Sequence, residues 1–235
     1  MKFFRGIRQS LIKTGNLKKY LLYAIGEILL VMIGISLAFQ LSNWVDNRIK
    51  KNAEIRFYEN IKDQIIEDKG LIQEMVVYNN RHMVQFKYAN EIIENNDRSK
   101  LDTLGKIVRN LTNYSDFDKE GNIYETMVNS GQVSLLQNHE IVNGIRVLEE
   151  TYNYINRMES IHYDAVIQHV AVAISPVVAF TNNEIKKPDE VFRYQFQNLV
   201  IMLMQIMDEK DRTYTEGLEE IEYILKLIND ELDTK

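Results

Sequence analysis

The sequence predicts an all-α protein in which an N-terminal transmembrane helix is followed by an extracytoplasmic antiparallel helical bundle. Three observations support this fold class. Residues 20–41 form an apolar run that contains one ionisable group. Apolar residues recur at helical spacing through most of the remaining chain. The 235 residues include two prolines and ten glycines, which is little of the turn-forming content that an all-β fold needs. We therefore expect a basic cytoplasmic amphipathic segment (1–19), a transmembrane helix (20–43) and a helical extracytoplasmic domain (44–235).

The composition excludes several classes of protein. The chain has no cysteine, which excludes disulfide scaffolds, thiolate zinc sites, iron–sulfur clusters and cysteine nucleophiles. Its formal net charge of −6 is unevenly divided, since residues 1–43 carry +5 and residues 44–235 carry −11. The acidic part would repel phosphate groups, which argues against nucleic acid as a partner. The basic start favours anionic lipid, so we expect the lipid bilayer to be a partner.

The first 19 residues are basic and contain no acid. We expect the following cations to lie at the membrane surface: Lys2, Arg5, Arg8, Lys18 and Lys19. Phe3, Phe4, Ile7 and Leu11 follow one another at helical spacing, which predicts a short amphipathic helix in the headgroup layer. The alternative is a terminal tail whose cations only set the orientation of the next helix.

The apolar run 20–41 is long enough to cross a bilayer. Its 22 residues rise about 1.5 Å each, which covers the roughly 30 Å of hydrocarbon. Tyr23 near one end and Trp44 at the other suit the interfacial aromatic belts. The positive-inside rule predicts a cytoplasmic N-terminus, although the residues after Trp44 are also basic. The alternatives are a signal peptide cleaved near Ser36-Leu37-Ala38 and the core helix of a soluble protein.

One stripe of this span stands out. Glu27, Gly34 and Ala38 lie within about 20° of one line along the helix. Gly34 and Ala38 form a small-xxx-small pair, which lets another helix approach closely, so we expect a homo-oligomer. Three interpretations of Glu27 stay open. It forms a ring that binds ions or relays protons, it makes a hydrogen bond between helices, or it is a protonated acid that reaches the headgroups.

The residues after the span are predicted to be helical almost throughout. Apolar positions keep spacings of three and four over 57–93, and no helix-breaking residue lies at 44–56, so the span is expected to continue into this segment. Asp68 interrupts the apolar line near Gly70, which predicts a kink or break. Residues 95–99 are expected to end this helix.

Shorter helices are expected in the middle of the chain, at 101–112 and 122–129, with a polar loop at 113–121 between them. Gly131 suits the position that follows the second of these helices. Asn138 is expected to cap the next helix.

The last part of the chain is expected to contain a helix at 139–170 and two more at 189–208 and 211–233. Residues 165–180 are almost wholly apolar and contain Pro176. They are too few for an ordinary membrane span, so we expect the central buried helix of the bundle there. A re-entrant membrane segment is the alternative.

No motif points to catalysis. Residues 116–121 resemble the start of a calcium loop, but its twelfth position would be Met127 in place of the required acid. Glu159 and His162 have the spacing of di-iron ligands, yet no other histidine follows a Glu by three residues. His169 lies in an apolar run, as core histidines do. Motifs of serine hydrolases, zinc proteases and nucleotide-binding proteins are missing from the sequence. We therefore expect no enzymatic activity, no cofactor and no metal site.

Three segments of the sequence carry a family resemblance: the basic start at residues 2–8, the span motif at 20–28 and the segment Tyr124–Gly131. With them, nearly the whole chain resembles a family of small bacterial membrane-anchored proteins that is known only as a domain of unknown function. The resemblance implies a single-pass protein of the bacterial inner membrane with a cytoplasmic N-terminus and a periplasmic α-helical domain. It implies no activity, substrate or catalytic residue.

Our leading hypothesis is a non-enzymatic, self-associating membrane protein whose helical domain acts in assembly, sensing or partner binding. A protein partner for that domain is part of this expectation. The alternative is an oligomeric ion channel or proton-coupled component in which Glu27 faces the oligomer axis. A third hypothesis is a membrane-tethered hydrolase or metalloenzyme that depends on His162.

Overall fold

The computed structural model describes residues 17–117 and 123–234. The all-α class is confirmed, because within those ranges the strands are one antiparallel pair in which Val178 lies opposite Ile185. In chain order the elements are α2 (Leu17–Glu94), η1 (Arg98–Lys100), α3 (Leu101–Asn110), α4 (Ile123–Asn129), η2 (Gln132–Leu135), α5 (His139–Ala165), the π-helical turn η3 (Val166–Val170), α6 (Ala171–Ile174), β1 (Val178–Ala179), β2 (Glu184–Ile185), α7 (Pro188–Val191) and α8 (Tyr194–Asp233).

The chain divides into two compact units, Met1–Glu54 and Ile55–Lys235. In the described part of the first unit, no other element packs against the apolar side chains of α2. The large apolar side chains from Leu21 to Leu41 are between 49% and 72% exposed. By length and composition, the apolar part of α2 could cross a membrane.

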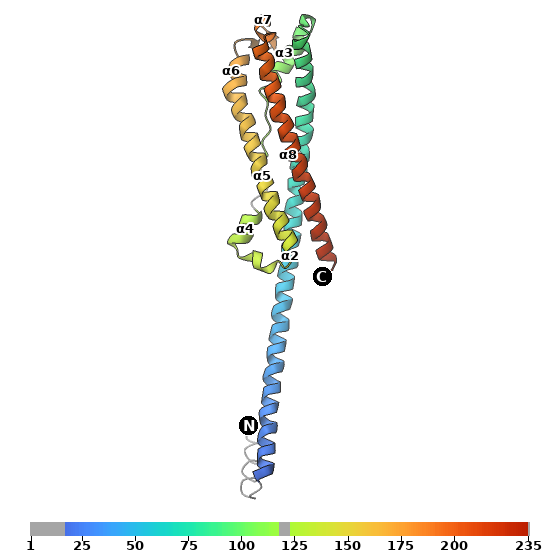
Figure 1. The fold of residues 1–235 in the computed structure, drawn as a ribbon, viewed down its shortest axis with the longest axis vertical. Coiled ribbons are helices and arrows are strands. Elements are labelled where there is room, and N and C mark those ends of the chain that lie inside the picture. Colours follow the sequence, from blue (N-terminus) through green and yellow to red (C-terminus); the bar gives the residue numbers. More distant parts are fainter. Residues whose placement is uncertain (1–16, 118–122, 235) are drawn as a thin grey trace. The chain divides into compact units, whose positions relative to one another are not determined.

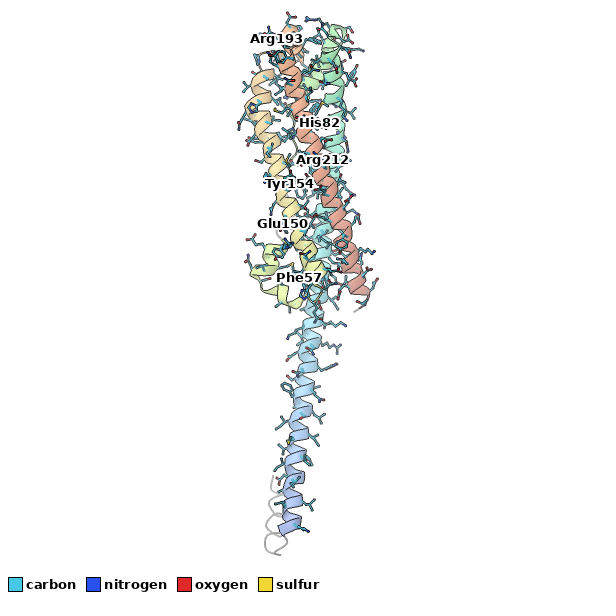
Figure 2. All side chains as sticks on the ribbon, viewed as in Figure 1. Phe57, His82, Glu150, Tyr154, Arg193 and Arg212 are labelled. Carbon is cyan, nitrogen blue, oxygen red and sulfur yellow. The ribbon has the colours of Figure 1, made fainter. Side chains whose placement is uncertain are left out.

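The second unit contains three long helical segments, namely residues 55–94 of α2, α5 and α8 (Figure 1). The predicted antiparallel arrangement holds for α5 and α8. It is wrong for α2 and α5, which run in the same direction, because the chain returns along the bundle after α3 and its described part at 113–117 is not helical (Figure 1). Charged side chains such as Glu150 and Arg212 lie on the outside of the bundle (Figure 2).

The interior of this unit consists of two apolar clusters. The first cluster joins the end of α2, α3, the segment after α5 and the start of α8, with members that include Phe86, Leu104, Ile174 and Leu203. The second cluster joins the preceding part of α2, α4, α5 and the rest of α8, with members that include Ile65, Ile145, Tyr152 and Ile221. Burial of such side chains is the main favourable term in folding.

Several predicted boundaries are confirmed. Helix α2 ends at Glu94, and no break occurs between residues 44 and 56. The helix α4 ends at Asn129, and Gly131 adopts the left-handed conformation with φ of 70°, which favours glycine. Asn138 caps α5, since its side-chain oxygen accepts hydrogen bonds from the backbone N–H groups of Glu140 and Ile141.

Three predictions of local structure are wrong. No break interrupts α2 at Gly70, where the buried Asp68 carboxylate interacts with the hydroxyl of Tyr152 in α5. Residues 165–180 do not form a central buried helix. They comprise η3, α6, a turn and β1, and side chains such as Val172 and His169 are exposed.

The third correction concerns the predicted break at 208–211, because α8 is one helix from Tyr194 to Asp233. The run Asp208-Glu209-Lys210-Asp211 resembles a loop in composition. In the helix, Lys210 alone among these four residues is fully buried.

Gly105 in α3 makes a close approach that no other residue type would permit. A Cβ atom at this position would overlap the backbone carbonyl oxygen of Asn183, in the turn between β1 and β2. The β1–β2 turn therefore packs directly on the backbone of α3, which covers one end of the first apolar cluster.

Candidate functional site

Buried polar side chains separate the two apolar clusters at one level of the bundle. The three long helices α2, α5 and α8 each contribute two of these polar side chains. In each helix, the two polar residues lie between the part that belongs to the first apolar cluster and the part that belongs to the second. Ser115, from the segment between α3 and α4, adds a seventh. We call these seven residues the polar layer: Asn79 and His82 from α2, Ser115, Glu159 and His162 from α5, and Lys210 and Thr213 from α8.

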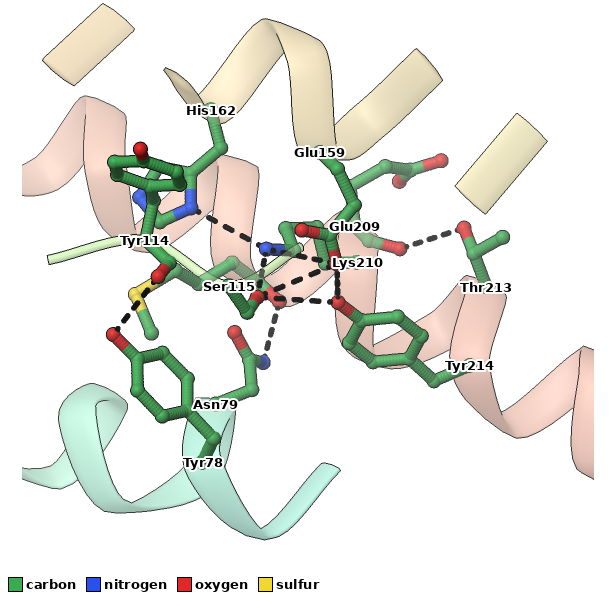
Figure 3. A network of polar contacts seen from close by, with 11 residues as sticks. Tyr78, Asn79, Tyr114, Ser115, Glu159, His162, Glu209, Lys210, Thr213 and Tyr214 are labelled. Atoms are coloured by element: carbon green, nitrogen blue, oxygen red, sulfur yellow. Dashed lines mark hydrogen bonds and ion pairs between the residues drawn. The ribbon is translucent and has the colours of Figure 1, made fainter. Parts of the chain in front are cut away.

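Lys210 lies at the centre of the polar layer, with its side chain 1% exposed (Figure 3). Its Nζ atom donates to the Oγ of Ser115 at 2.6 Å and to the Nδ1 of His162 at 3.4 Å. It also forms an ion pair with the Oε1 of Glu159 at 3.4 Å. An ammonium group has three N–H donors, and here each has an acceptor. Burial lowers the pKa of Lys210, and the negative charge of Glu159 opposes that shift.

Glu159 faces Lys210 from α5 and is 4% exposed. Its Oε1 atom accepts hydrogen bonds from the hydroxyl groups of Tyr214 and Ser115, the latter at 3.3 Å. Its Oε2 atom is buried and has no hydrogen-bond partner among the described residues. Burial raises the pKa of Glu159, while Lys210 and the two hydroxyl groups act in the opposite direction. Burial and Glu159 together raise the pKa of Tyr214.

His162 is held neutral in the polar layer. Burial and the nearby positive charge of Lys210 lower its pKa to about 3. Its Nε2 atom is buried and is also without a partner among the described residues. In the described part of the chain, no three His, Asp or Glu side chains lie close enough together to hold a metal ion.

The layer also ties the helices together through the backbone. The side-chain amide of Asn79 in α2 donates to the backbone oxygen of Met207 in α8 at 2.9 Å (Figure 3). The hydroxyl of Tyr78 donates to the backbone oxygen of Tyr114 at 3.3 Å. These contacts attach both α8 and the non-helical segment around Ser115 to α2.

A surface cavity of about 530 Å³ lies next to the polar layer. It is bordered by residues 114–117 on one side and by one face of α5 on the other, and both Ser115 and Glu159 contribute to its wall. The rings of Tyr114 and Tyr163 meet edge to face at its border, with centroids 4.9 Å apart. The volume lies within the range of small-molecule sites. The arrangement can therefore admit a small ligand beside a buried ion pair.

Sequence reasoning singled out Glu159 and His162 but missed their partners. The apolar stripe of α8 runs through Met207, Lys210 and Tyr214 at helical spacing, so the position of Lys210 was a detectable signal that it lies in the core. No signal of that kind marks Ser115, because its position depends on the path of a non-helical segment.

The residues predicted to form the membrane stripe all lie in α2. Glu27 is half-buried, Gly34 and Ala38 are exposed, and a Cβ atom at Gly34 would meet nothing within 4 Å. Their role as an oligomer interface stays a prediction. Of the cations expected at the membrane surface, Lys18 is exposed at the start of α2. The others fall outside the described residues, namely Lys2, Arg5, Arg8 and the side chain of Lys19.

Comparison with known proteins identifies the family of this chain. The model of a family of unknown function (DUF6090) matches residues 27–209, which include the stripe and the whole polar layer except Lys210 and Thr213. No curated protein and no solved structure matches the chain. Because the match covers most of the sequence and confirms the resemblance to a family of unknown function, the chain belongs to this family.

Proposed function

We propose that this protein is a non-enzymatic, membrane-anchored module that self-associates through α2 and uses its helical domain in sensing or partner binding. The observation that carries the membrane anchor is the exposure of the apolar segment from Leu21 to Leu41. Burying one such side chain is worth about 1.5 kcal/mol or more, so leaving a whole segment of them in water is strongly unfavourable. A lipid bilayer would bury these side chains, and the length of the segment matches the thickness of the hydrocarbon core.

Self-association would use the stripe of Glu27, Gly34 and Ala38. Gly34 has open space around it, so the backbone of a second helix can come close. A carboxyl group in the hydrocarbon is unfavourable by about 2.5–3.5 kcal/mol near the centre, and a hydrogen bond to a neighbouring helix would offset part of that cost.

The test of self-association is the native mass of the full-length protein in mild detergent. Wild type is compared with Glu27→Gln, Gly34→Leu and the control Gly26→Leu, which places the same side chain about 80° away from Gly34 around the helix. We expect a defined oligomer that Glu27→Gln or Gly34→Leu disrupts and Gly26→Leu does not. A monomeric wild type, or an oligomer that neither stripe variant changes, would overturn self-association through this stripe. A change in ion flux through proteoliposomes on Glu27→Ala would favour the channel alternative.

The test of orientation exploits the absence of cysteine from the sequence. We propose that the N-terminus lies in the cytoplasm and the helical domain in the periplasm of the bacterial inner membrane. A membrane-impermeant maleimide applied to intact cells should label Thr215→Cys, whose position is exposed in the bundle, and should leave Ser10→Cys unlabelled. The reverse labelling pattern would invert the proposed orientation.

A further inference from the structure

We infer that the cavity beside the polar layer binds a small organic amine in its ammonium form. The cavity is bordered by Tyr114, Asp116, Asn156, Glu159, Ser160 and Tyr163, among others. This site lies in the helical domain and does not depend on membrane anchoring or self-association. Four features of the cavity support a cationic ligand over a neutral or anionic one.

The first feature is charge. Two carboxylates, Asp116 and Glu159, belong to the cavity wall, and the described residues of that wall include no lysine or arginine. Lys210 lies behind the wall and pairs with Glu159. Asp116 is close enough to raise the pKa of Lys210 as well. The carboxylates of Asp116 and Glu159 thus lie near one cation, Lys210, and a bound cationic ligand would neutralise the remaining negative charge.

The second feature is a buried carboxylate oxygen without a donor. All the contacts that Glu159 makes with Lys210, Tyr214 and Ser115 go to Oε1. No described residue donates to Oε2, and Glu159 is part of the cavity wall. Buried polar atoms are rarely left without a partner. An ammonium group supplies both the charge and the N–H donors that this oxygen lacks.

The third feature is aromatic. Tyr114 and Tyr163 border the cavity with their rings edge to face, at an interplanar angle of 76°, and each residue is 43% exposed. The face of an aromatic ring attracts cations. Asn156 and Ser160 lie in α5, three residues before Glu159 and Tyr163 respectively, and add neutral acceptors along the same wall.

The fourth feature argues against an anion. Lys210, which pairs with the wall residue Glu159, is 1% exposed, and its three N–H donors already have acceptors in the polar layer. An anionic ligand would therefore face the carboxylates of Asp116 and Glu159, with no lysine or arginine among the described residues of the wall. A metal ion is also disfavoured, because no three ligating side chains converge in the described part of the chain.

The test is calorimetric titration of the full-length protein in mild detergent with four small probes. The probes are n-butylammonium, tetramethylammonium, n-butanol and butyrate. Tetramethylammonium has the positive charge without N–H donors, n-butanol has the butyl chain without a charge, and butyrate carries a negative charge. We expect saturable binding of n-butylammonium in the millimolar range, weaker binding of tetramethylammonium, and none of n-butanol or butyrate. Equal binding of n-butanol, preference for butyrate, or the absence of saturable binding by all four probes would overturn the inference.

Two variants assign the binding to this cavity. Asp116→Asn changes an exposed side chain, so the fold should tolerate it, and Glu159→Gln removes the charge while keeping a similar shape. We expect each to weaken n-butylammonium binding by about tenfold or more, as the loss of a charged hydrogen-bond partner does. The matched control Asp230→Asn removes the same charge from an exposed position of α8 outside the cavity wall and should leave binding unchanged. Binding that neither Asp116→Asn nor Glu159→Gln weakens would place the amine elsewhere and overturn the inference.

Discussion

The Nζ atom of Lys210 lies 2.6 Å from the Oγ atom of Ser115, although 95 residues separate the two in the chain. This contact attaches a segment without helical structure to the middle of α8. It also brings Ser115 within 3.3 Å of the Glu159 carboxylate on α5. One buried ammonium group therefore holds together three parts of the chain that apolar packing alone would leave loosely defined at this level.

Removal of the buried charge should destabilise the helical domain strongly. Lys210→Met leaves Glu159 buried without its cation, and the loss of one member of a buried ion pair costs about 3–5 kcal/mol. We expect a fall of about 3 kcal/mol in the free energy of unfolding, measured by urea titration of the full-length protein in mild detergent with circular dichroism.

The matched control for this change is Lys226→Met, at an exposed position of the same helix, which should alter the free energy of unfolding by less than about 0.5 kcal/mol. The double variant Lys210→Met with Glu159→Gln should recover part of the loss, because the unpaired charge is then gone. Equal effects of Lys210→Met and Lys226→Met would show that the buried ion pair has no net role in stability.

Stability should fall as the pH is lowered through the range in which histidine normally titrates. The pKa of His162 is about 3 in the folded protein, while an unfolded histidine titrates near 6.5. The unfolded chain therefore binds one more proton between these values, so the contribution of His162 is complete above pH 6.5 and is lost as the pH falls toward 3. We expect a loss of about 1 kcal/mol between pH 7.5 and 5.5.

His162→Gln should remove most of this pH dependence, because glutamine does not titrate. The variant His169→Gln changes an exposed histidine and serves as the control, which should keep the wild-type slope. The measurement is the free energy of unfolding at the two pH values for all three proteins. An unchanged slope in His162→Gln would assign the pH dependence to other groups.

The same substitution at two helical glycines should have opposite effects. Gly105→Ala would place a Cβ atom against the backbone oxygen of Asn183, so either α3 or the β1–β2 turn must move, and we expect a loss of about 1–3 kcal/mol. Gly70→Ala meets nothing within 4 Å in α2 and should gain about 1 kcal/mol from helix propensity. Thermal unfolding of the two variants beside wild type tests whether stability falls in the first and rises in the second. If Gly105→Ala left the stability unchanged, the close approach of Asn183 to Gly105 would be contradicted.

The contribution of the Asn138 cap to the stability of the helical domain should be measurable separately. Asn138→Ala removes the acceptor for the N–H groups of Glu140 and Ile141, which typically costs about 1 kcal/mol. Asn138→Ser keeps a capping oxygen and should cost clearly less, although it loses the contact between Asn138 and Glu231. Equal destabilisation by Ala and Ser would assign the effect to the Glu231 contact in place of the cap.

The sequence was informative where structure depends on local signals. The end of α2 at Glu94, the left-handed Gly131 and the cap at Asn138 each follow from a short motif that acts within one helical turn. The class of the fold follows from the spacing of apolar residues.

Predictions failed where distant contacts decide the local structure. Asp68 reads as an interruption, yet Tyr152 on another helix accommodates its carboxylate inside a continuous α2. The run around Lys210 reads as a loop because it is charged, yet Glu159 and Ser115 provide the partners that let it stay helical and buried. The site could be predicted only in part for the same reason, since Glu159 and His162 form a motif whereas Ser115 does not.

The polar layer has a mechanical consequence for the helical domain. Sliding α8 along α5 by one turn, about 5.4 Å, would carry Lys210 away from Glu159, and in one direction toward the apolar side chain of Ile155. A buried charge without a partner is strongly unfavourable, so only one axial alignment of the helices keeps Lys210 paired. A conformational change in this domain is therefore expected to tilt or bend α8, and not to move it as a piston.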